Sequence, residues 1–248
     1  MLESFGFSIC LNTIGNRIAV GGPYNDGNGD NSGHVQIYEW NGVNWIQIGL
    51  DIDGEFGGNP GLYGGDHSGS SISLNGLGNR VAIGAPYNPG PVLVHPQVNT
   101  ARGHVRVFEE INGSWLQLGL DICGIENIAA FGSSVSLDSA GNTLVLGGND
   151  SVKVYNWNGL NWQENNTFYS EQIGDGLGQA RCGTMISADG ENIILGALAN
   201  NDNGLESGHA RVFENRPSCE ADTSYTDLTT CDSILWNGIN YYSSGTYS

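Results

Sequence analysis

One acidic segment of the chain has the residue types and spacing that could bind a divalent cation. Asp26, Asn28 and Asp30 alternate with glycine, so oxygen donors stand at every second position, as at the start of an EF-hand loop. An EF-hand has Gly at its sixth position and Glu at its twelfth, where this chain has Asn31 and Ile37. We therefore predict a looser calcium site rather than an EF-hand.

A second acidic segment shows the same alternation, with Asp51, Asp53 and Glu55 separated by single residues. Carboxylate oxygens are ligands that Ca²⁺ prefers, and a bound cation would relieve the repulsion among them. Calcium is the one cofactor for which the sequence offers candidate ligands. These are the six side chains of the two segments, Asp26, Asn28, Asp30, Asp51, Asp53 and Glu55.

Histidines invite a metal or catalytic interpretation, but their placement indicates structure. His34, His104 and His209 each follow a glycine at the same point of a repeated segment, and repetition at equivalent sites favours a packing role. His67 and His95 lie in loops without a spaced partner. The sequence contains no G-x-S-x-G motif or phosphate-binding loop, and the expected fold gathers no Ser/His/Asp set. We therefore predict that the chain is not an enzyme.

Charge excludes two classes of partner. The 248 residues include 26 acidic and 8 basic side chains, for a net charge of −18. A nucleic-acid-binding protein needs a cationic surface that displaces counterions, and recognition of anionic lipid needs one too. No apolar run reaches the ~18 residues of a membrane-spanning helix. We expect no nucleic-acid partner and no membrane insertion, and the oligomeric state stays open.

Internal repetition is the strongest pattern in the sequence. A short apolar strand, a glycine-containing turn and a second apolar strand recur four times, at 8–25, 71–88, 134–148 and 184–197. In the last copy, Thr184–Ser187 is expected to take the place that Ser134–Leu137 takes in the third. Two further strands follow in most copies, often around an Asn-Gly turn, which is a strong hairpin signal.

Each repeat is therefore predicted to be four short antiparallel strands, named a to d in chain order. Such a unit, at a period of roughly 40–60 residues, is typical of a β-propeller blade. We predict an all-β propeller at 1–215, with approximate repeats 5–55, 67–126, 131–174 and 181–215. Its four blades are expected to be a fragment of a larger ring, which would expose the flat faces of the end blades.

The residues at the strand ends resemble a known repeat. Phe5-Gly6 and Phe131-Gly132 before strand a, with Gly84-Ala85-Pro86 after strand b, resemble the FG-GAP repeat. That repeat builds the propeller of integrin α subunits and of related bacterial secreted proteins. The resemblance implies a secreted or cell-surface protein. The family's calcium loop between strands a and b is degraded here, because apolar residues stand at ligand positions, so those sites are not carried over.

Two other resemblances are present, and kelch repeats are the close alternative to the FG-GAP repeat. Gly-Gly doublets and an aromatic residue seven positions before a Trp are similar to kelch repeats, which also form propellers. Trp45, Trp115 and Trp162 are the tryptophans concerned, and we expect them to pack between blades. Residues 216–248 are predicted to be a linker and a truncated small β module, similar to one in large secreted proteins of Bacteroidota-like bacteria.

Loop lengths assign a binding face. In an a-b-c-d meander the ab and cd turns lie on one side, and here they are short. The bc and da loops lie on the other side and vary widely in length, and insertions on one face often mark the binding face. Nearly half of the acidic residues lie in these loops: Asp26, Asp30, Asp51, Asp53, Glu55, Asp66, Asp121, Glu126, Glu171, Asp175, Asp202 and Glu206.

These observations favour a non-enzymatic binding or adhesion module that presents one propeller face to a protein or glycan, outside the cell or on a bacterial surface. Two alternatives stay open. One is a fragment of a catalytic, glycosidase-like propeller whose active residues lie outside this chain. The other is a structural repeat without a ligand. The five cysteines are widely spaced, and Cys10 and Cys182 are expected to be small apolar side chains on strands.

Overall fold

The computed structural model describes residues 3–58, 64–90, 101–124, 130–179 and 183–215, and the backbone of 234–236 and 239–241. Two compact units divide the chain, Met1–Asn215 and Arg216–Ser248. Within the second unit, the described part is a hairpin of β18 (Ile234–Trp236) and β19 (Ile239–Tyr241). His95, Glu126, Cys182, Cys219, Cys231 and the predicted linker at 216–218 lie outside the described residues.

The first blade is an antiparallel meander. Its strands are β1 (Ser8–Leu11), β2 (Arg17–Gly22), β3 (His34–Trp40) and β4 (Trp45–Gln47), each paired with the next. A short further strand, β5 (Ile52–Asp53), pairs with the start of β3. The predicted outer strand d is therefore split into two pieces, β4 and β5, that lie along the same neighbour.

The second blade repeats this construction. β6 (Ser71–Leu74), β7 (Arg80–Ala85) and β8 (His104–Ile111) are paired in order. The outer strand again has two pieces, β9 (Ser114–Gln117) and β10 (Ile122–Cys123), and both pair with β8. The two blades therefore agree in strand order and in the break of strand d.

The third and fourth blades differ in their outer strands. Blade 3 has an unbroken outer strand: β11 (Ser134–Leu137), β12 (Thr143–Gly147), β13 (Ser151–Trp157) and β14 (Trp162–Tyr169). Blade 4 has three strands among the described residues: β15 (Thr184–Ile186), β16 (Asn192–Ala197) and β17 (His209–Glu214).

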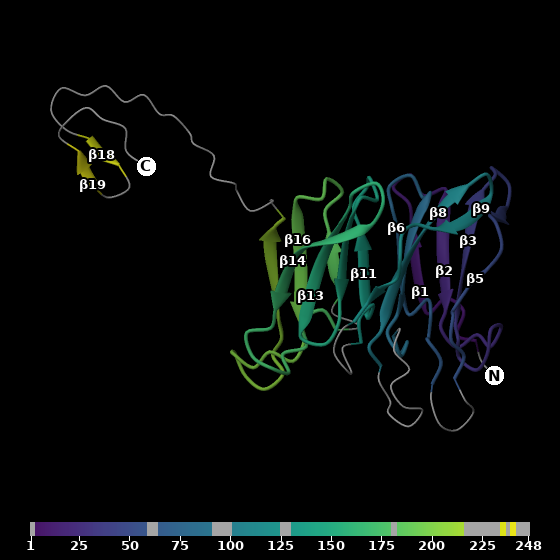
Figure 1. Cartoon of the computed structure of the whole chain (residues 1–248), viewed down its shortest axis with the longest axis horizontal. Coiled ribbons are helices and arrows are strands. Elements are labelled where there is room, and N and C mark those ends of the chain that lie inside the picture. Colours follow the sequence, from purple (N-terminus) through teal and green to yellow (C-terminus); the bar gives the residue numbers. More distant parts are fainter. Residues whose placement is uncertain are drawn as a thin grey trace. The chain divides into compact units, whose positions relative to one another are not determined.

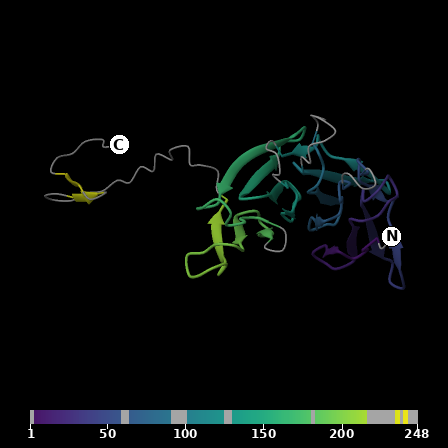
Figure 2. The ribbon, with the colours of Figure 1, turned by 90° about the horizontal axis from the view of Figure 1, so that it is seen from below.

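Together the four antiparallel sheets form a four-blade β-propeller, as predicted (Figure 1). The innermost strands β1, β6, β11 and β15 lie next to one another in sequence order. Seen along the strands, the blades follow an arc that is open between the first and the fourth (Figure 2). The described residues include no helix, and hence none that could cross a membrane.

The backbone conformation of the ab turn explains why a glycine stands there. Gly15 and Gly78 have φ of +71° and +75°, a left-handed conformation that costs little without a Cβ. Before each turn, the side chain of Asn12 or Asn75 accepts a hydrogen bond from the backbone N–H that begins strand b, at 3.0 and 2.9 Å. The repeated Asn and Gly thus fix the hairpin that joins the two inner strands.

Each blade has two faces, because successive side chains of a strand point to opposite sides. We call the face toward the preceding blade the leading face and the other the trailing face. A trailing face packs on the next leading face in three hydrophobic cores. The trailing rows that run across strands a, b and c are Cys10–Ala19–Ile37, Ser73–Ala82–Val107 and Ser136–Val145–Val154. The leading rows that meet them are Leu74–Val81–Phe108, Leu137–Leu144–Tyr155 and Ile186–Ile193–Phe213.

Repeated hydrogen bonds join the blades as well. Serine hydroxyls on strand a donate to a glycine carbonyl of the next blade at 2.6, 2.7 and 3.0 Å, in the pairs Ser8–Gly69, Ser71–Gly132 and Ser134–Gly178. At the outer strands of the first two interfaces, Trp115 Nε1 donates to Ile48 O and Trp162 Nε1 donates to Leu118 O, each at 3.0 Å. Trp115 and Trp162 therefore pack between blades, as predicted, whereas Trp45, for which the same was expected, is 43% exposed.

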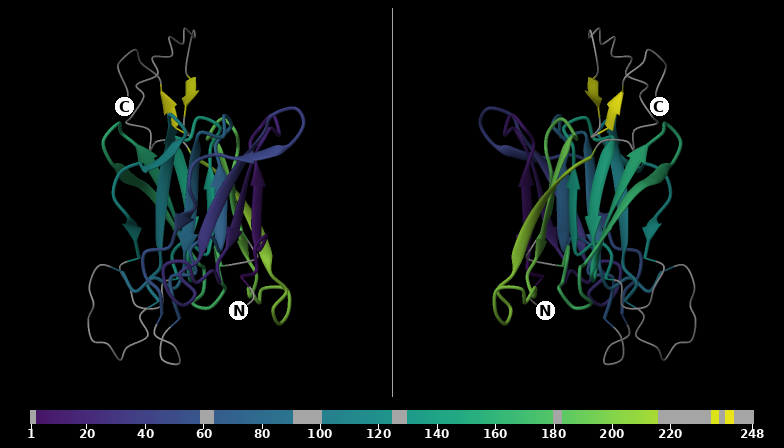
Figure 3. Two further views of the ribbon diagram at one scale, coloured as in Figure 1. Left: turned by 90° about the vertical axis from the view of Figure 1, so that its right-hand side faces the viewer. Right: turned by 90° about the vertical axis from the view of Figure 1, so that its left-hand side faces the viewer.

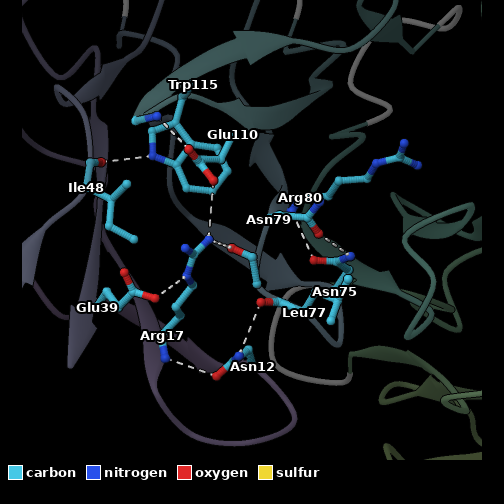
Figure 4. Close-up of polar contacts among 12 residues, drawn as sticks. Asn12, Arg17, Glu39, Ile48, Asn75, Leu77, Asn79, Arg80, Glu110 and Trp115 are labelled. Atoms are coloured by element: carbon cyan, nitrogen blue, oxygen red, sulfur yellow. Dashed lines mark hydrogen bonds and ion pairs between the residues drawn. The ribbon is translucent and has the colours of Figure 1, made fainter. Parts of the chain in front are cut away.

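Arginine adds a third repeated contact. Arg17 Nη1 donates to Gly78 O at 3.2 Å and lies 3.7 Å from Glu110 Oε2, both in blade 2 (Figure 4). Arg80 makes the equivalent bond to Gly141 O of blade 3 at 3.0 Å. Both side chains are therefore part of the blade interfaces.

The predicted alignment of the fourth repeat is wrong by one residue. Ser73 Oγ accepts the N–H of Leu137 at 3.0 Å, and Ser136 Oγ accepts the N–H of Ile186 at 3.1 Å. Ile186 is therefore equivalent to Leu137, and Met185 stands where blades 2 and 3 have serine. The alternation in Thr184–Ser187 does not determine the register, because its apolar and polar residues fit either phase.

Candidate functional site

The loops that differ between repeats leave the propeller on one side. The ab and cd turns lie at the top of Figure 1, and the described parts of the bc and da loops lie at the bottom. We call this lower side the loop face. Its described segments are 23–33, 54–58, 64–70, 86–90, 101–103, 170–179 and 198–208.

A row of aromatic rings crosses the loop face from blade 1 to blade 2. The Phe7 and Tyr24 ring centroids are 6.2 Å apart, those of Tyr24 and His67 are 4.9 Å apart, and those of His67 and Tyr87 are 4.5 Å apart. Phe7 is 59% exposed and Tyr87 is 52% exposed, so the two ends of the row face solvent. We call these four residues the aromatic row.

The backbone fixes the central ring of the row. His67 has φ of +53°, and its carbonyl accepts bonds from the N–H of Ser70 at 3.1 Å and from its hydroxyl at 2.7 Å. Ser4 and Ala130, at the equivalent positions of blades 1 and 3, also have positive φ. Burial lowers the pKa of the His67 imidazole, and the nearby charge of Asp30 opposes that shift. The ring is therefore held in place by a turn that the repeat itself encodes.

The first predicted calcium segment is tied to the backbone around it. Asp26 Oδ1 accepts the N–H of Asn31 at 2.9 Å, and Asn28 Nδ2 donates to Gly54 O at 2.7 Å. Asp30 pairs through its backbone with Gly58. These contacts bring the first acidic segment against the end of the second one, so the two predicted clusters meet on the loop face.

The carboxylates of the second segment differ in their surroundings. Asp51 accepts bonds from the amides of Gln36 at 2.8 Å and Gln47 at 2.6 Å, and it lies 3.3 Å from His34 Nδ1. Burial alone would raise the pKa of Asp51, but the two amide bonds and the imidazole outweigh it and lower the pKa. Burial raises the pKa of Asp53, with the Asp51 charge adding to the shift.

Glu55 belongs to a polar cluster across the interface of blades 1 and 2. Arg106 Nη2 donates to Asp53 O at 2.6 Å, and Arg106 Nη1 lies 3.5 Å from Glu55. His104 Nδ1 is 3.9 Å from both Glu55 and Asp121. Burial, then the Arg106 charge, lowers the pKa of His104 to about 4. The imidazole is therefore neutral at physiological pH.

Two groups of described residues hold three metal-ligand atoms within 4.8 Å of one another. They are His104, Asp121 and Cys123, and Glu171, Asp202 and His209. Arg106, two residues after His104 on β8, pairs with Glu55 of blade 1 beside the first group, and Arg211 forms an ion pair with Glu171 in the second. Neither group contains a predicted calcium ligand, and calcium binding by the six predicted residues stays a prediction.

Other loop acids are structural. Asp66 is fully buried, and its carboxylate accepts the N–H of Glu55 and Phe56 at 2.8 and 2.9 Å and the Asn88 amide at 2.8 Å. Burial raises the pKa of Asp66. In blade 4, Asp175 and Asn200 form the equivalent pair at 3.2 Å. These pairs clamp the da loop to the bc loop rather than adding to an acidic surface.

The remaining predicted residues are placed as follows. His34 and His104 are buried on leading faces, and His209 is half-buried, in keeping with a structural role. Cys10 is half-buried on β1, and burial raises the pKa of its thiol to about 11. The aromatic row was not predicted, although the repeated Pro-Tyr-Asn of Tyr24 and Tyr87 was a signal for it.

Comparison with known proteins leaves the family open. No protein-family model matches the chain, and no curated protein matches it. One solved structure that resembles it is Kuenenia stuttgartiensis hydrazine synthase, with 14% identity and a TM-score of 0.49. The match covers 85% of this chain, which spans 58% of the length of the matched chain.

Proposed function

We propose that the chain is a non-enzymatic binding module of a secreted or cell-surface protein, which presents the loop face to a protein or glycan. The observation that carries the proposal is the aromatic row. Its exposed ends and its fixed centre form a rigid apolar platform among polar loops. Aromatic side chains with such exposure are enriched in binding hot spots, and they stack on sugar rings and apolar side chains alike.

The scaffold under the row supports the same role. Buried bonds of Asp66 hold the loops that carry His67 and Tyr87, so a ligand would meet a preorganised surface. Preorganisation lowers the ordering cost of binding. The net charge of −18 would favour a cationic or neutral ligand over an acidic one.

A non-enzymatic role is supported by the bonds that hold three carboxylates of the da loop. Asp66 is bound by backbone and amide donors, and Asp51 is bound by two glutamines. Glu55 is paired with Arg106. Groups held this way fix strands and loops in place, whereas catalysis needs a base or nucleophile free to react.

A binding screen with a glycan array and with candidate extracellular proteins tests the proposal. For any ligand found, Tyr87→Ala is expected to weaken affinity by roughly 10-fold or more, as for a hot-spot tyrosine. Tyr169→Ala is the matched control, because Tyr169 is an exposed tyrosine, at 72% against 52% for Tyr87, but lies at the end of β14 in blade 3. The proposal fails if Tyr24→Ala and Tyr87→Ala leave the affinity intact, or if the screen finds no ligand.

A further inference from the structure

The leading face of blade 1 carries the packing residues of an interface without a neighbouring blade. Ile9 and Leu11 are 67% and 57% exposed, whereas Ile72 and Leu74, their equivalents in blade 2, are 9% and 7% exposed. The cross-strand partners of Ile9 and Leu11 are apolar as well, as they are in blade 2. Figure 3 views the propeller from its two ends, with blade 1 nearest in the left panel.

The outer part of this face repeats the pattern. Trp45 is 43% exposed on the leading side of β4, and its equivalent Trp115 bonds to Ile48 O of the preceding blade. Phe108, which blade 2 buries against blade 1, has Tyr38 as its equivalent. The face therefore retains the residues through which blade 2 packs on its predecessor.

The opposite end of the propeller exposes a trailing face. Met185, Ile194 and Val212 form one cross-strand row of blade 4, and they are 65%, 43% and 68% exposed. In blade 2 the last two positions are Ala82 and Val107, which are buried. Blade 4 has no serine on this row, since Met185 stands where Ser73 and Ser136 stand, and the face is more apolar for it.

We propose that a second copy of this chain covers these faces, with the trailing face of blade 4 in one copy packed on the leading face of blade 1 in the other. Every described blade interface joins a trailing face to a leading face, and the two open faces are one of each kind. The proposed contact continues an interface that the molecule already makes three times. Large exposed apolar patches of this kind mark association sites.

The symmetry of the contact follows from its two different surfaces. A contact between unlike faces is heterologous, and it closes when the rotation brings the free ends together. Two copies that dock at both ends form a ring of about eight blades, within the range of four to eight that propellers use. The proposal is therefore a closed head-to-tail dimer.

Sedimentation equilibrium of the full chain tests the oligomeric state. The expected mass is twice the 26.3 kDa of one chain, with dissociation on dilution. A monomer throughout roughly 1–100 μM, where a micromolar interface would be populated, overturns the proposal. A mass that grows without limit overturns the closed ring.

Charge placed on either face is expected to break the dimer. Ile9→Asp and Val212→Asp should each give a monomer with an unchanged circular dichroism spectrum, because both side chains are exposed within one chain. Leu160→Asp is the matched control, since Leu160 is exposed in the cd turn of blade 3, and it should remain dimeric.

Mixing the two variants tests the head-to-tail arrangement. A copy with Ile9→Asp keeps an intact trailing face, and a copy with Val212→Asp keeps an intact leading face, so an equal mixture should recover one interface and dimerise. Two results contradict the arrangement: a mixture that stays monomeric, and a Val212→Asp variant that still dimerises, which would indicate contact between two leading faces.

Discussion

The leading faces of blades 1 and 2 have nearly the same residues in opposite surroundings. In blade 2, Leu74 lies in a core against blade 1, and in blade 1 the equivalent Leu11 faces solvent. The repeat encodes the packing surface in every copy, whether or not a neighbour is present. Burial, and with it the contribution to stability, depends on the adjacent blade.

Truncation of Leu74 and of Leu11 should give the largest difference in unfolding free energy between the two faces. Leu74→Ala is expected to lower the free energy of unfolding by about 2–5 kcal/mol, because it leaves a cavity in a buried core. Leu11→Ala is expected to cost about 0.5 kcal/mol or less in the monomer, as for an exposed side chain. Urea unfolding at a concentration where the chain is monomeric measures both. Equal losses would show that the two faces do not differ as described.

Acid should weaken the buried interface through His104. Its folded pKa of about 4 lies below the ordinary value of 6.5, because burial and Arg106 disfavour the charged imidazole. The unfolded chain therefore binds more protons between these values, and stability falls as the pH drops through this window. The loss is on the order of 3 kcal/mol, at about 1.4 kcal/mol per pKa unit.

The His104→Gln variant isolates this contribution from that of the carboxylates. Its free energy of unfolding, measured between pH 7 and pH 4, should fall less steeply than that of the wild type. If the two profiles run in parallel, His104 does not couple folding to pH.

The tryptophans offer a smaller, matched comparison. Trp115→Phe removes the Nε1–H bond to Ile48 O and is expected to cost about 1 kcal/mol of unfolding free energy. Trp45→Phe, on the open face, is expected to change it by a few tenths of a kcal/mol. Thermal or urea unfolding of the two variants, at a concentration where the chain is monomeric, measures both costs. A larger cost for Trp45→Phe than for Trp115→Phe would contradict the comparison of the two faces.

Calcium should have the smallest effect on stability. If the predicted ligands from Asp26 to Glu55 bind the ion with a Kd near its concentration, the stabilisation is about 0.4 kcal/mol. Melting curves in calcium and in chelator should then differ by a small rise in Tm that the double variant Asp30→Asn, Asp53→Asn removes. An unchanged Tm eliminates the calcium site.

The fold could be predicted because the same local sequence features recur in successive blades. The Asn-Gly turns, the two-residue alternation and the recurring tryptophans all indicate the same four-stranded unit. The break of strand d could not be predicted, since β5 and β10 are two-residue pairings. The register of the first strand in blade 4 was also predicted wrongly, because Met185 replaces the serine that marks this strand in blades 2 and 3.

The loop face was harder to predict, because its chemistry depends on contacts between repeats. Asp66 and Asp175 belong to loops in the sequence and were counted as part of an acidic surface. Both are buried, and they hold a da loop to a bc loop. The aromatic row joins Tyr24 and Tyr87 of different blades through His67, which has no sequence partner. Only the meeting of adjacent blades brings these rings together.

The central claim is that blade 1 carries, on its open side, a surface built to receive another blade. Hydrogen–deuterium exchange of the full chain, measured at low and at high protein concentration, tests it most directly. The account predicts that protection of β1, β2, β16 and β17 rises with concentration, while β6, β7, β11 and β12 stay unchanged. Exchange in all these strands that does not depend on concentration would contradict it.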